Sequence, residues 1–469
     1  MNQKINIGIH LLLFVVLVIM AFVTGGYGSD GDSITHYFFA KGAWQNPMYL
    51  FDQWAKPFFT LFASPFAQFG FIGIKVFNIT CGVLSSYFAT QVARVLGKKW
   101  FWLIPVFAFA TPAYYSYLFS GLTEPFSGLV LILSIYLCLT KRVSAGFILA
   151  SFLAFCRTEA QVYLFLFALF AISNGQLKKV PLLLVSYVVY TVVGYFFTHD
   201  LFWVFSHPYN STGSVYGSGT WWHYLSEMRN ENTIVPLLLA ALGLLASIGR
   251  ITEKVYDWRN ELWLVHGIFF STLIGHSLMW YLGVFGSAGM PRTILPVYPL
   301  LWIILIDGLG FLERITVRYV IKFKTLIAIL LCCQLVIAVS GPYAGYYFMN
   351  NLPPNTDQQF IKAEVVPFVK AAFPKAEQFV IEHPFLGLAL DINFIDYKQR
   401  IVWTEYSKNN WNPNWIWIYE SRITEQQSGV TVQQIEEDGK LKLLRKFVSS
   451  EGWEYYVYVQ ADRNLTSQF

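Results

Sequence analysis

The sequence predicts an all-α polytopic membrane domain of about eleven transmembrane helices, followed by a small α/β domain outside the membrane. Of the 469 residues, 55% are hydrophobic and only 13% are charged, whereas a soluble chain carries about 25% charged residues. Aromatic residues make up 18%, as expected for rings that lie at the two membrane interfaces. The basic residues form short clusters between apolar runs, which is typical of topology determinants and not of nucleic-acid binding.

Nine apolar runs come close to the length of about twenty residues that a spanning helix needs. They lie at 7–24, 66–93, 101–118, 125–140, 180–198, 233–249, 261–284, 293–311 and 325–341. We interpret the first run as an uncleaved helix, although small residues follow it as they would at a cleavage site.

The stretch 143–173 decides the topology because Arg157 and Glu159 interrupt it. If it forms two short spans with Arg157 at the outer mouth, all basic clusters fall on one side, as the positive-inside rule favours. One single span would move the later clusters to the other side. We therefore expect a multi-pass membrane protein with a cytoplasmic N-terminus and an extracytoplasmic C-terminus.

This topology divides the chain into a transmembrane domain at 1–341 and an extracytoplasmic domain at 342–469. The membrane domain carries two long outer loops, at 25–65 and 199–232, and residues 51–59 in the first loop resemble a helix lying on the membrane. In the C-terminal domain, the spacing of apolar residues predicts a helix over 357–373. Strands are predicted at 377–382 and 399–404, and a hairpin is predicted from arms at 441–448 and 453–459.

The first outer loop contains two carboxylates, Asp30 and Asp32, directly after the first span. When two carboxylates lie close together, the pKa of one of them is raised, which suits a general base that works near neutral pH. The alternative is an exposed turn, since Gly, Ser and Asp are common turn residues. No cofactor is required by the sequence, but a divalent metal ion held by Asp30 or Asp32 stays open.

Three further charged residues lie where spans meet the outer side. Glu124 fits the start of a helix, with Thr123 as its cap and Pro125 in the first turn, or else a site facing the acidic pair. Arg157 and Glu159 are costly within a membrane and line a cavity, contact other partners or mark a break in the helix. They cannot pair directly along one regular helix, because they are two residues apart.

Cations and aromatic loop residues complete the candidate substrate-binding set. Arg292 stands at an outer helix end, where a guanidinium binds phosphate well, or simply anchors the helix at the interface. Lys56 has the same two interpretations. We also expect His207 and Tyr209, in the second outer loop, to bind substrate. The eight histidines contain no zinc-binding spacing, and the five cysteines lie in apolar runs, where they behave as small hydrophobic residues.

These segments resemble the GT-C glycosyltransferases, integral membrane enzymes that use polyprenyl-phosphate-linked sugars, and most of all the protein O-mannosyltransferase and aminoarabinose-transferase branch. The motifs that carry the resemblance are Asp30-Gly-Asp32-Ser-Ile-Thr-His-Tyr-Phe-Phe-Ala40, Trp54-Ala-Lys56-Pro57, Thr123-Glu124-Pro125 and Arg292-Thr-Ile-Leu-Pro296-Val-Tyr-Pro299. In this register Asp32 matches the catalytic aspartate of the branch. The chain departs from the branch at Ser33, where an acidic residue often follows the aspartate.

The resemblance is to the bacterial form of the branch, and it implies an inverting sugar transfer at the outer face of a bacterial inner or plasma membrane. Asp32 would deprotonate an acceptor hydroxyl of a glycan, lipid or protein, and the oxygen would displace polyprenyl phosphate from the sugar. Lys56, Arg292 and Arg157 would stabilise the leaving phosphate. Two other functions compete with this one: a transporter or flippase of a lipid-linked or anionic solute, and a non-catalytic scaffold. A transporter predicts internal repeats with polar residues at mid-membrane, and the sequence shows neither.

Overall fold

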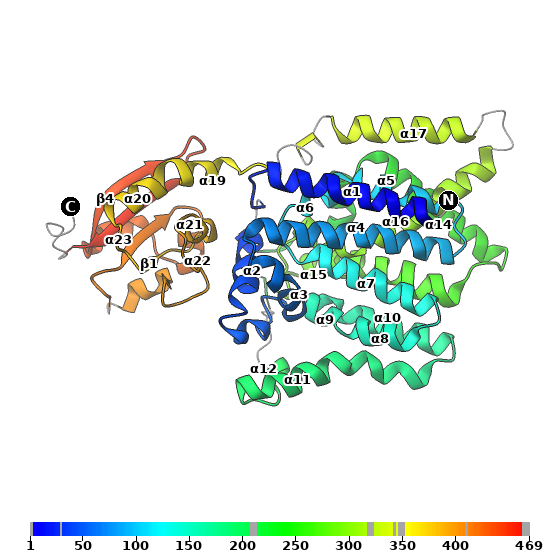
Figure 1. Ribbon diagram of the computed structural model, residues 1–469, viewed down its shortest axis with the longest axis horizontal. Helices are drawn as coiled ribbons and strands as arrows, with labels where there is room; N and C mark the ends of the chain where they lie inside the picture. Colours follow the sequence, from blue (N-terminus) through cyan, green and yellow to red (C-terminus); the bar gives the residue numbers. More distant parts are fainter. Residues whose placement is uncertain are drawn as a thin grey trace.

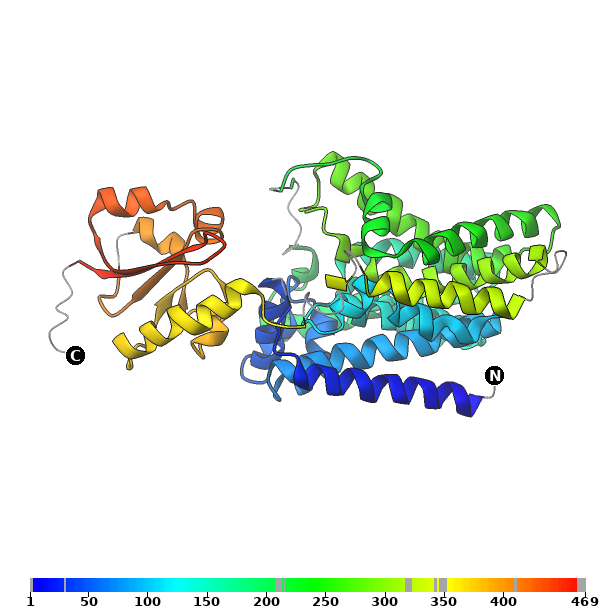
Figure 2. The same ribbon diagram turned by 90° about the horizontal axis from the view of Figure 1, so that it is seen from above.

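The computed structural model describes residues 3–28, 31–206, 213–214, 216–316, 323–340, 344–345, 352–408 and 411–461. Within these ranges the chain forms a large helical part, which ends with α17, and a smaller C-terminal part that contains the β-sheet (Figure 1). The two parts lie end to end, and the start of α1 lies at the end of the helical part farther from the sheet (Figure 2).

Six helical segments among the described residues are long and apolar enough to cross a membrane. They are α1 (Gln3–Val23), α4 (Phe71–Val95), η4–α11 (Leu177–Thr198), α14 (Ile234–Thr252), η5–α15 (Trp258–Leu282) and η6–α16 (Pro291–Thr316). Shorter apolar helices are α3 (Pro57–Ala67), α7 (Glu124–Leu139), α8–α9 (Val143–Cys156), η3–α10 (Thr158–Ser173) and α17 (Phe323–Ala338). These are the features of a multi-pass membrane protein, while the count of eleven spans stays a prediction.

The single span expected at 101–118 is wrong, because the chain breaks there into short helices. They are η2 (Phe101–Leu103), α5 (Ile104–Phe109) and α6 (Pro112–Tyr117). Pro112 has no N–H with which to continue the helix before it. The carbonyl group of Ala110 at the break accepts a hydrogen bond of 2.6 Å from the side chain of Gln334 in α17. A distant helix thus satisfies the backbone group that the break exposes.

The stretch 143–173 does form two short helical segments, as predicted. Helices α8 (Val143–Ser151) and α9 (Leu153–Cys156) end at Arg157, whose backbone is extended, with φ −154° and ψ 129°. The chain then continues through η3 (Thr158–Ala160) into α10 (Gln161–Ser173).

The surface helix expected over 51–59 is also wrong. Residues 51–56 form a bend and turn after η1 (Pro47–Leu50), and α3 starts only at Pro57. The proline disfavours helical backbone in the residue before it. Lys56 adopts φ 62°, in the left-handed region and outside right-handed helical backbone.

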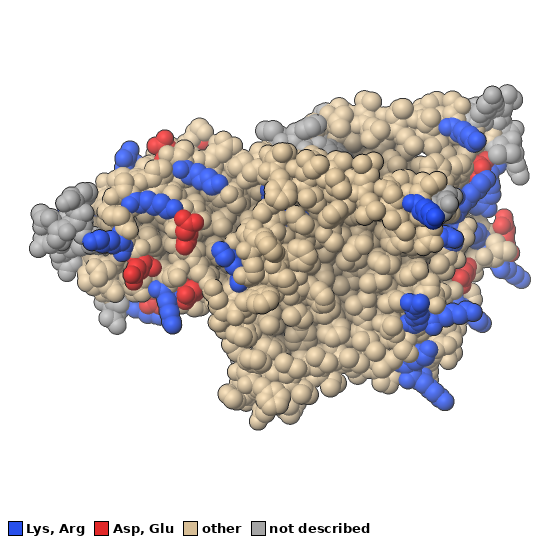
Figure 3. Space-filling view, viewed as in Figure 1, with Lys and Arg blue, Asp and Glu red and all other residues tan. Residues whose placement is uncertain are grey.

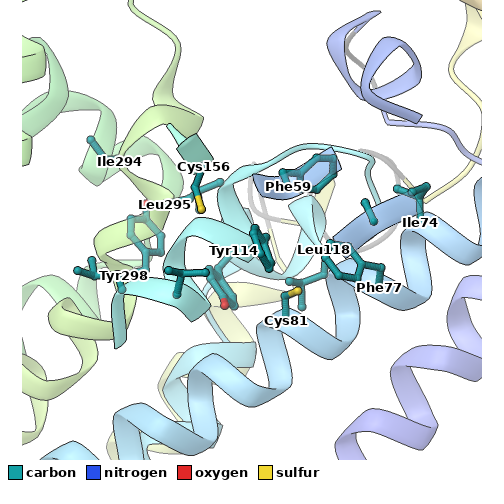
Figure 4. Packing of buried hydrophobic residues seen from close by; sticks show 14 of the residues in the cluster. Phe59, Ile74, Phe77, Cys81, Tyr114, Leu118, Cys156, Ile294, Leu295 and Tyr298 are labelled. Atoms are coloured by element: carbon teal, nitrogen blue, oxygen red, sulfur yellow. The ribbon is translucent and has the colours of Figure 1, made fainter. Parts of the chain in front are cut away.

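Helices pack most closely where glycines allow their backbones to touch. A Cβ atom on Gly243 of α14 would lie 1.9 Å from the carbonyl oxygen of Ile304 in α16, and one on Gly308 would lie 1.8 Å from that of Leu239. Small residues commonly permit such contacts between membrane helices. Phe59, Phe77 and Cys81 pack with Tyr114 and Leu118 in the buried core (Figure 4).

At the end of the helical part farther from the sheet, Lys98 and Arg250 belong to the basic clusters between apolar runs, and both form ion pairs. Lys98 lies 2.7 Å from Glu261 and 2.8 Å from Asp307. Arg250 pairs with the same two carboxylates, at 2.8 and 2.7 Å. This cluster joins the end of α4 to α14, η5 and α16.

The C-terminal part contains a five-stranded mixed sheet in the order β2-β1-β3-β5-β4. Its strands are β1 (Phe379–Val380), β2 (Arg400–Ile401), β3 (Ile416–Glu420), β4 (Leu441–Val448) and β5 (Glu454–Gln460). Its helices are α19 (Thr356–Phe360), η8 (Ile361–Val365), α20 (Val366–Ala372), α21 (Pro384–Ala389), η9 (Trp403–Lys408), α22 (Thr424–Ser428) and α23 (Val432–Asp438).

Most expected elements of this part are confirmed. The helix predicted over 357–373 corresponds to α19, η8 and α20 in succession, and the predicted hairpin to β4 and β5, which pair antiparallel. The strands predicted at 377–382 and 399–404 are present but only two residues long, and they pair parallel. The sequence analysis missed β3, the central strand, whose residues 416–420 are all buried.

The C-terminal part rests on the segment that leads into α2 (Gly31–Gly42). The side-chain amide of Gln358 donates to the carbonyl of Gly28 at 3.0 Å, and Lys362 donates to the hydroxyl of Tyr27 at 2.9 Å. The hydroxyl of Tyr49 donates to the carbonyl of Ile395 at 3.3 Å. The sheet-containing part therefore supports the helix that bears Asp32.

Candidate active site

Asp32 lies in the first turn of α2, and two close contacts fix this turn. The hydroxyl of Ser33 donates to the carbonyl of Tyr27 at 2.8 Å and accepts from the backbone N–H of Gly121 at 2.7 Å. A Cβ atom on Gly121 would lie 2.2 Å from the carbonyl oxygen of Ser33. Only glycine therefore lets the loop before α7 approach α2 this closely.

Glu124 and Arg292 lie beside this turn. Glu124 begins α7 and is 1% exposed. Arg292, in η6 (Pro291–Val297), forms an ion pair of 2.5 Å with Asp32, and its Nε lies 3.7 Å from Glu124. The expected cap at Thr123 is wrong: its backbone is helical and its side chain caps no amide. Instead its hydroxyl accepts a hydrogen bond of 3.4 Å from Arg157.

Arg157 joins Glu124 to Glu159. Its guanidinium lies 2.6 Å from Glu124 and also forms an ion pair with Glu159. A regular helix would keep Arg157 and Glu159 apart, but the extended backbone at Arg157 brings them together. Of the alternatives that the sequence leaves open, the structure thus shows both a break in the helix and a distant partner.

Lys56 is buried beside this group. Its ammonium donates to the carbonyl of Gln53 at 3.1 Å and to the hydroxyl of Thr158 at 3.4 Å. Burial lowers the pKa of Lys56 to about 8, although the charge of Glu159 opposes this shift. A lysine with left-handed backbone costs about 1–3 kcal/mol, and such strain clusters at functional sites.

Six of the nine residues proposed from the sequence are therefore neighbours: Asp32, Lys56, Glu124, Arg157, Glu159 and Arg292. They comprise three cations and three carboxylates from segments far apart in the chain. Burial raises the pKa of Asp32, but the charge and hydrogen bond of Arg292, with smaller contributions from His36 and Arg157, together hold the pKa below its ordinary value. Asp30, His207 and Tyr209 lie outside the described residues.

This charged cluster borders two cavities. The first has a volume of about 370 Å³ and is lined by Asp32, Arg157, Glu159 and Arg292, among others. The second has about 680 Å³ and a mostly apolar wall from α9, α10, η4, α11 and α12 (Trp203–Ser206), with Lys56 on its border. Both cavities are lined by Thr158 and Gln161, so the charged cavity and the apolar groove meet there.

Sequence reasoning missed several residues of the charged cavity. Trp54 lines it, and its ring stacks on His36 with 4.7 Å between ring centroids. His276 and Tyr224 form part of another wall. Trp54 belongs to a motif that the sequence analysis noted, but it was not proposed as a site residue, while Tyr224 and His276 lie in the helices α13 and α15, where the local sequence gives no signal of a site. Among the described ranges, no group of three or more His, Cys, Asp or Glu residues could hold a metal ion.

Comparison with known proteins places this geometry in a known fold. No family profile matches the chain, and no curated protein matches its sequence. The crystal structure of ArnT from Cupriavidus metallidurans bound to undecaprenyl phosphate matches with a TM-score of 0.63, 11% identity and 98% coverage of both chains. The protein has the ArnT fold. The apo structure of ArnT matches with a TM-score of 0.60 and 12% identity, covering 96% of this chain and 97% of that one.

The match to ArnT extends over the helical part and the C-terminal part together, since it covers nearly the whole chain. The GT-C-like architecture expected from four short motifs is thus confirmed for the fold. At 11–12% identity the ArnT likeness establishes the fold alone, so the reaction must be argued from the residues of this chain.

Proposed function

We propose that the protein is a membrane glycosyltransferase that transfers a sugar from a polyprenyl-phosphate-linked donor to an acceptor hydroxyl, with inversion. The observation that carries this proposal is the meeting of an apolar groove of about 680 Å³ with a charged cavity of about 370 Å³. A polyprenyl-phosphate sugar combines an apolar chain with an anionic head in the same way. One structure with the ArnT fold is bound to undecaprenyl phosphate.

In this proposal the apolar chain of the donor lies in the groove and its phosphate lies where the two cavities meet. Groove residues such as Tyr187, Val188 and Val192 offer the apolar surface. Lys56 and Arg157 flank Thr158 at the junction, and Arg292 lies across the charged cavity. These cations stabilise the charge that develops on the leaving phosphate.

Asp32 serves as the general base. It removes the proton from the acceptor hydroxyl while the oxygen attacks the anomeric carbon, and the bond from that carbon to the phosphate oxygen breaks. A single displacement of this kind inverts the anomeric configuration. The ion pair with Arg292 keeps Asp32 ionised, but it also holds the carboxylate against the guanidinium and away from an acceptor hydroxyl. A donor phosphate competes for the same guanidinium, so donor binding releases the carboxylate for catalysis.

We further propose the orientation expected from the sequence, with residues 1–341 as the membrane domain and 342–469 as the extracytoplasmic domain. Lysine and arginine side chains gather at the end of the helical part farther from the C-terminal part, while the surface between the ends is nearly uncharged (Figure 3). That distribution is what the positive-inside rule predicts for a cytoplasmic end. The site then lies at the outer face, in contact with loops 25–65 and 199–232. The likeness to the ArnT fold does not favour the alternative function, a transporter or flippase.

The test is to express Asp32→Asn in the native host in place of the unaltered chain, and to compare these cells with cells that express the unaltered chain. Loss of a general base costs about 10²–10⁴-fold in rate, so mass spectrometry should find the sugar missing from cell-surface glycans and glycolipids. Asp391→Asn is the matched control, because Asp391 is an exposed carboxylate paired with Lys370 in the C-terminal part. Full transfer by a normally expressed Asp32→Asn variant would refute the assignment of the base.

A further inference from the structure

One wall of the charged cavity has no role in the proposed reaction. Tyr224 of α13 (His223–Glu231), His276 of α15 and Ser287 and Thr293 of the following segment contribute to it. The cavity volume of about 370 Å³ falls within the usual range for small-molecule sites, about 300–1,000 Å³. This wall is therefore available to a ligand group other than the phosphate.

His276 differs from the other described histidines buried in apolar helices. His10 contacts the carbonyl of Asn6 at 2.9 Å and the hydroxyl of Ser86 at 3.2 Å. His266 contacts Ser247 at 3.3 Å and Tyr256 at 2.8 Å. Within the described residues, no hydrogen bond joins the ring of His276 to another group. Neither nitrogen of His276 is among the described side-chain atoms that are fully buried without a partner, so the ring can offer its nitrogens to a ligand in the cavity that it lines.

His276 lies close to the carboxylate of Glu159. The Nε2 atom of His276 lies 3.9 Å from Oε1 of Glu159, and the ring of Tyr224 packs against the imidazole with 5.5 Å between centroids. Arg157 binds the same carboxylate and orients it. The ion pairs thus run from Asp32 through Arg292, Glu124, Arg157 and Glu159, and His276 stands at their far end.

We propose that His276, together with Glu159, recognises polar substituents on the ring of the transferred sugar, so that His276 is a specificity-determining residue. The inference rests on the proposed function. A carboxylate and an imidazole at this spacing can bind two adjacent hydroxyl groups, one as acceptor and one as either donor or acceptor. A site built to hydrogen-bond a substrate group strongly rejects analogues that lack it.

The experiment measures binding of lipid probes to the purified full chain in phospholipid nanodiscs. The probes are undecaprenyl phosphate itself and undecaprenyl phosphate carrying glucose, galactose, mannose or arabinose. In the unaltered chain, one sugar should bind more tightly than the bare lipid and more tightly than its epimers. His276→Phe keeps a buried ring but removes both nitrogens, so it should lower the affinity for that sugar by about 10-fold or more. Its affinity for the bare lipid should not change.

Two controls keep the outcome decisive. His10→Phe makes the same change at a buried histidine outside the cavity, and should alter neither affinity. His276→Asn keeps a hydrogen-bonding group, so it should retain part of the preference for one sugar over its epimers. If His276→Phe does not fold, the sugar preference of His276→Asn tests the inference instead. Failure of the unaltered chain to bind even bare undecaprenyl phosphate would count against the proposed function. If the bare lipid binds, the inference is overturned when no sugar adds affinity or when both variants discriminate as well as the unaltered chain.

Discussion

Removal of the charge of Arg157 should destabilise the protein by leaving Glu124 buried without its main partner. The two side chains are 13% and 2% exposed, and their charged atoms are 2.6 Å apart. At an effective dielectric constant of about 20, charges 4 Å apart already interact by about 4 kcal/mol. Breaking a buried pair by removing one partner costs about 3–5 kcal/mol. Arg292 remains 3.7 Å from Glu124, so we expect about 3 kcal/mol for Arg157→Met.

The assay is thermal unfolding in detergent, followed by size-exclusion chromatography of a fluorescent fusion. Arg157→Met should lower the unfolding midpoint more than Glu124→Gln does, because Arg157 keeps Glu159 as a partner in the second variant. The double variant should recover part of the loss, since it buries no unpaired carboxylate at position 124. If the decreases in unfolding midpoint of the two single variants simply add in the double variant, Arg157 and Glu124 are not energetically coupled and the reasoning is refuted. An Arg157→Met variant as stable as the unaltered chain would also refute it.

Two further predictions concern Lys56 and Gly121. Lys56 must be protonated to bind phosphate, and its pKa of about 8 lies below its ordinary value, so kcat/KM for the donor should be high below pH 8 and fall above it. Lys56→Arg should move this decline to higher pH, and a profile equal to that of the unaltered chain would exclude Lys56 from donor binding. Gly121→Ala would place a Cβ atom 2.2 Å from the backbone of Ser33, which should displace the turn that bears Asp32. Reduced sugar transfer with normal binding of undecaprenyl phosphate is expected, whereas normal transfer would show that the turn tolerates the shift.

The charged cluster shows how far the sequence leads. Six of its residues could be proposed in advance, because a charge within an apolar stretch is costly and because the predicted topology gathers the other charged residues of the set at one end of the spans. The contacts among these residues could not be proposed from the sequence. One is the ion pair between Arg292 and Asp32, and the other is the bridge that Arg157 forms between Glu124 and Glu159. Arg292 and Asp32 are 260 positions apart, and their pairing depends on how the helices pack.

What the sequence by itself determined is most of the apolar helices, because transfer into lipid depends on the composition of each local segment. Tertiary structure alone decided three further features: the break at Pro112 that Gln334 stabilises, the support of α2 by the C-terminal part, and the position of His276 opposite Glu159. Each of these requires segments far apart in the chain to meet at the distance of a hydrogen bond or ion pair. Such distances depend on how the helices pack together, because the sequence around each residue does not indicate which distant residue it contacts.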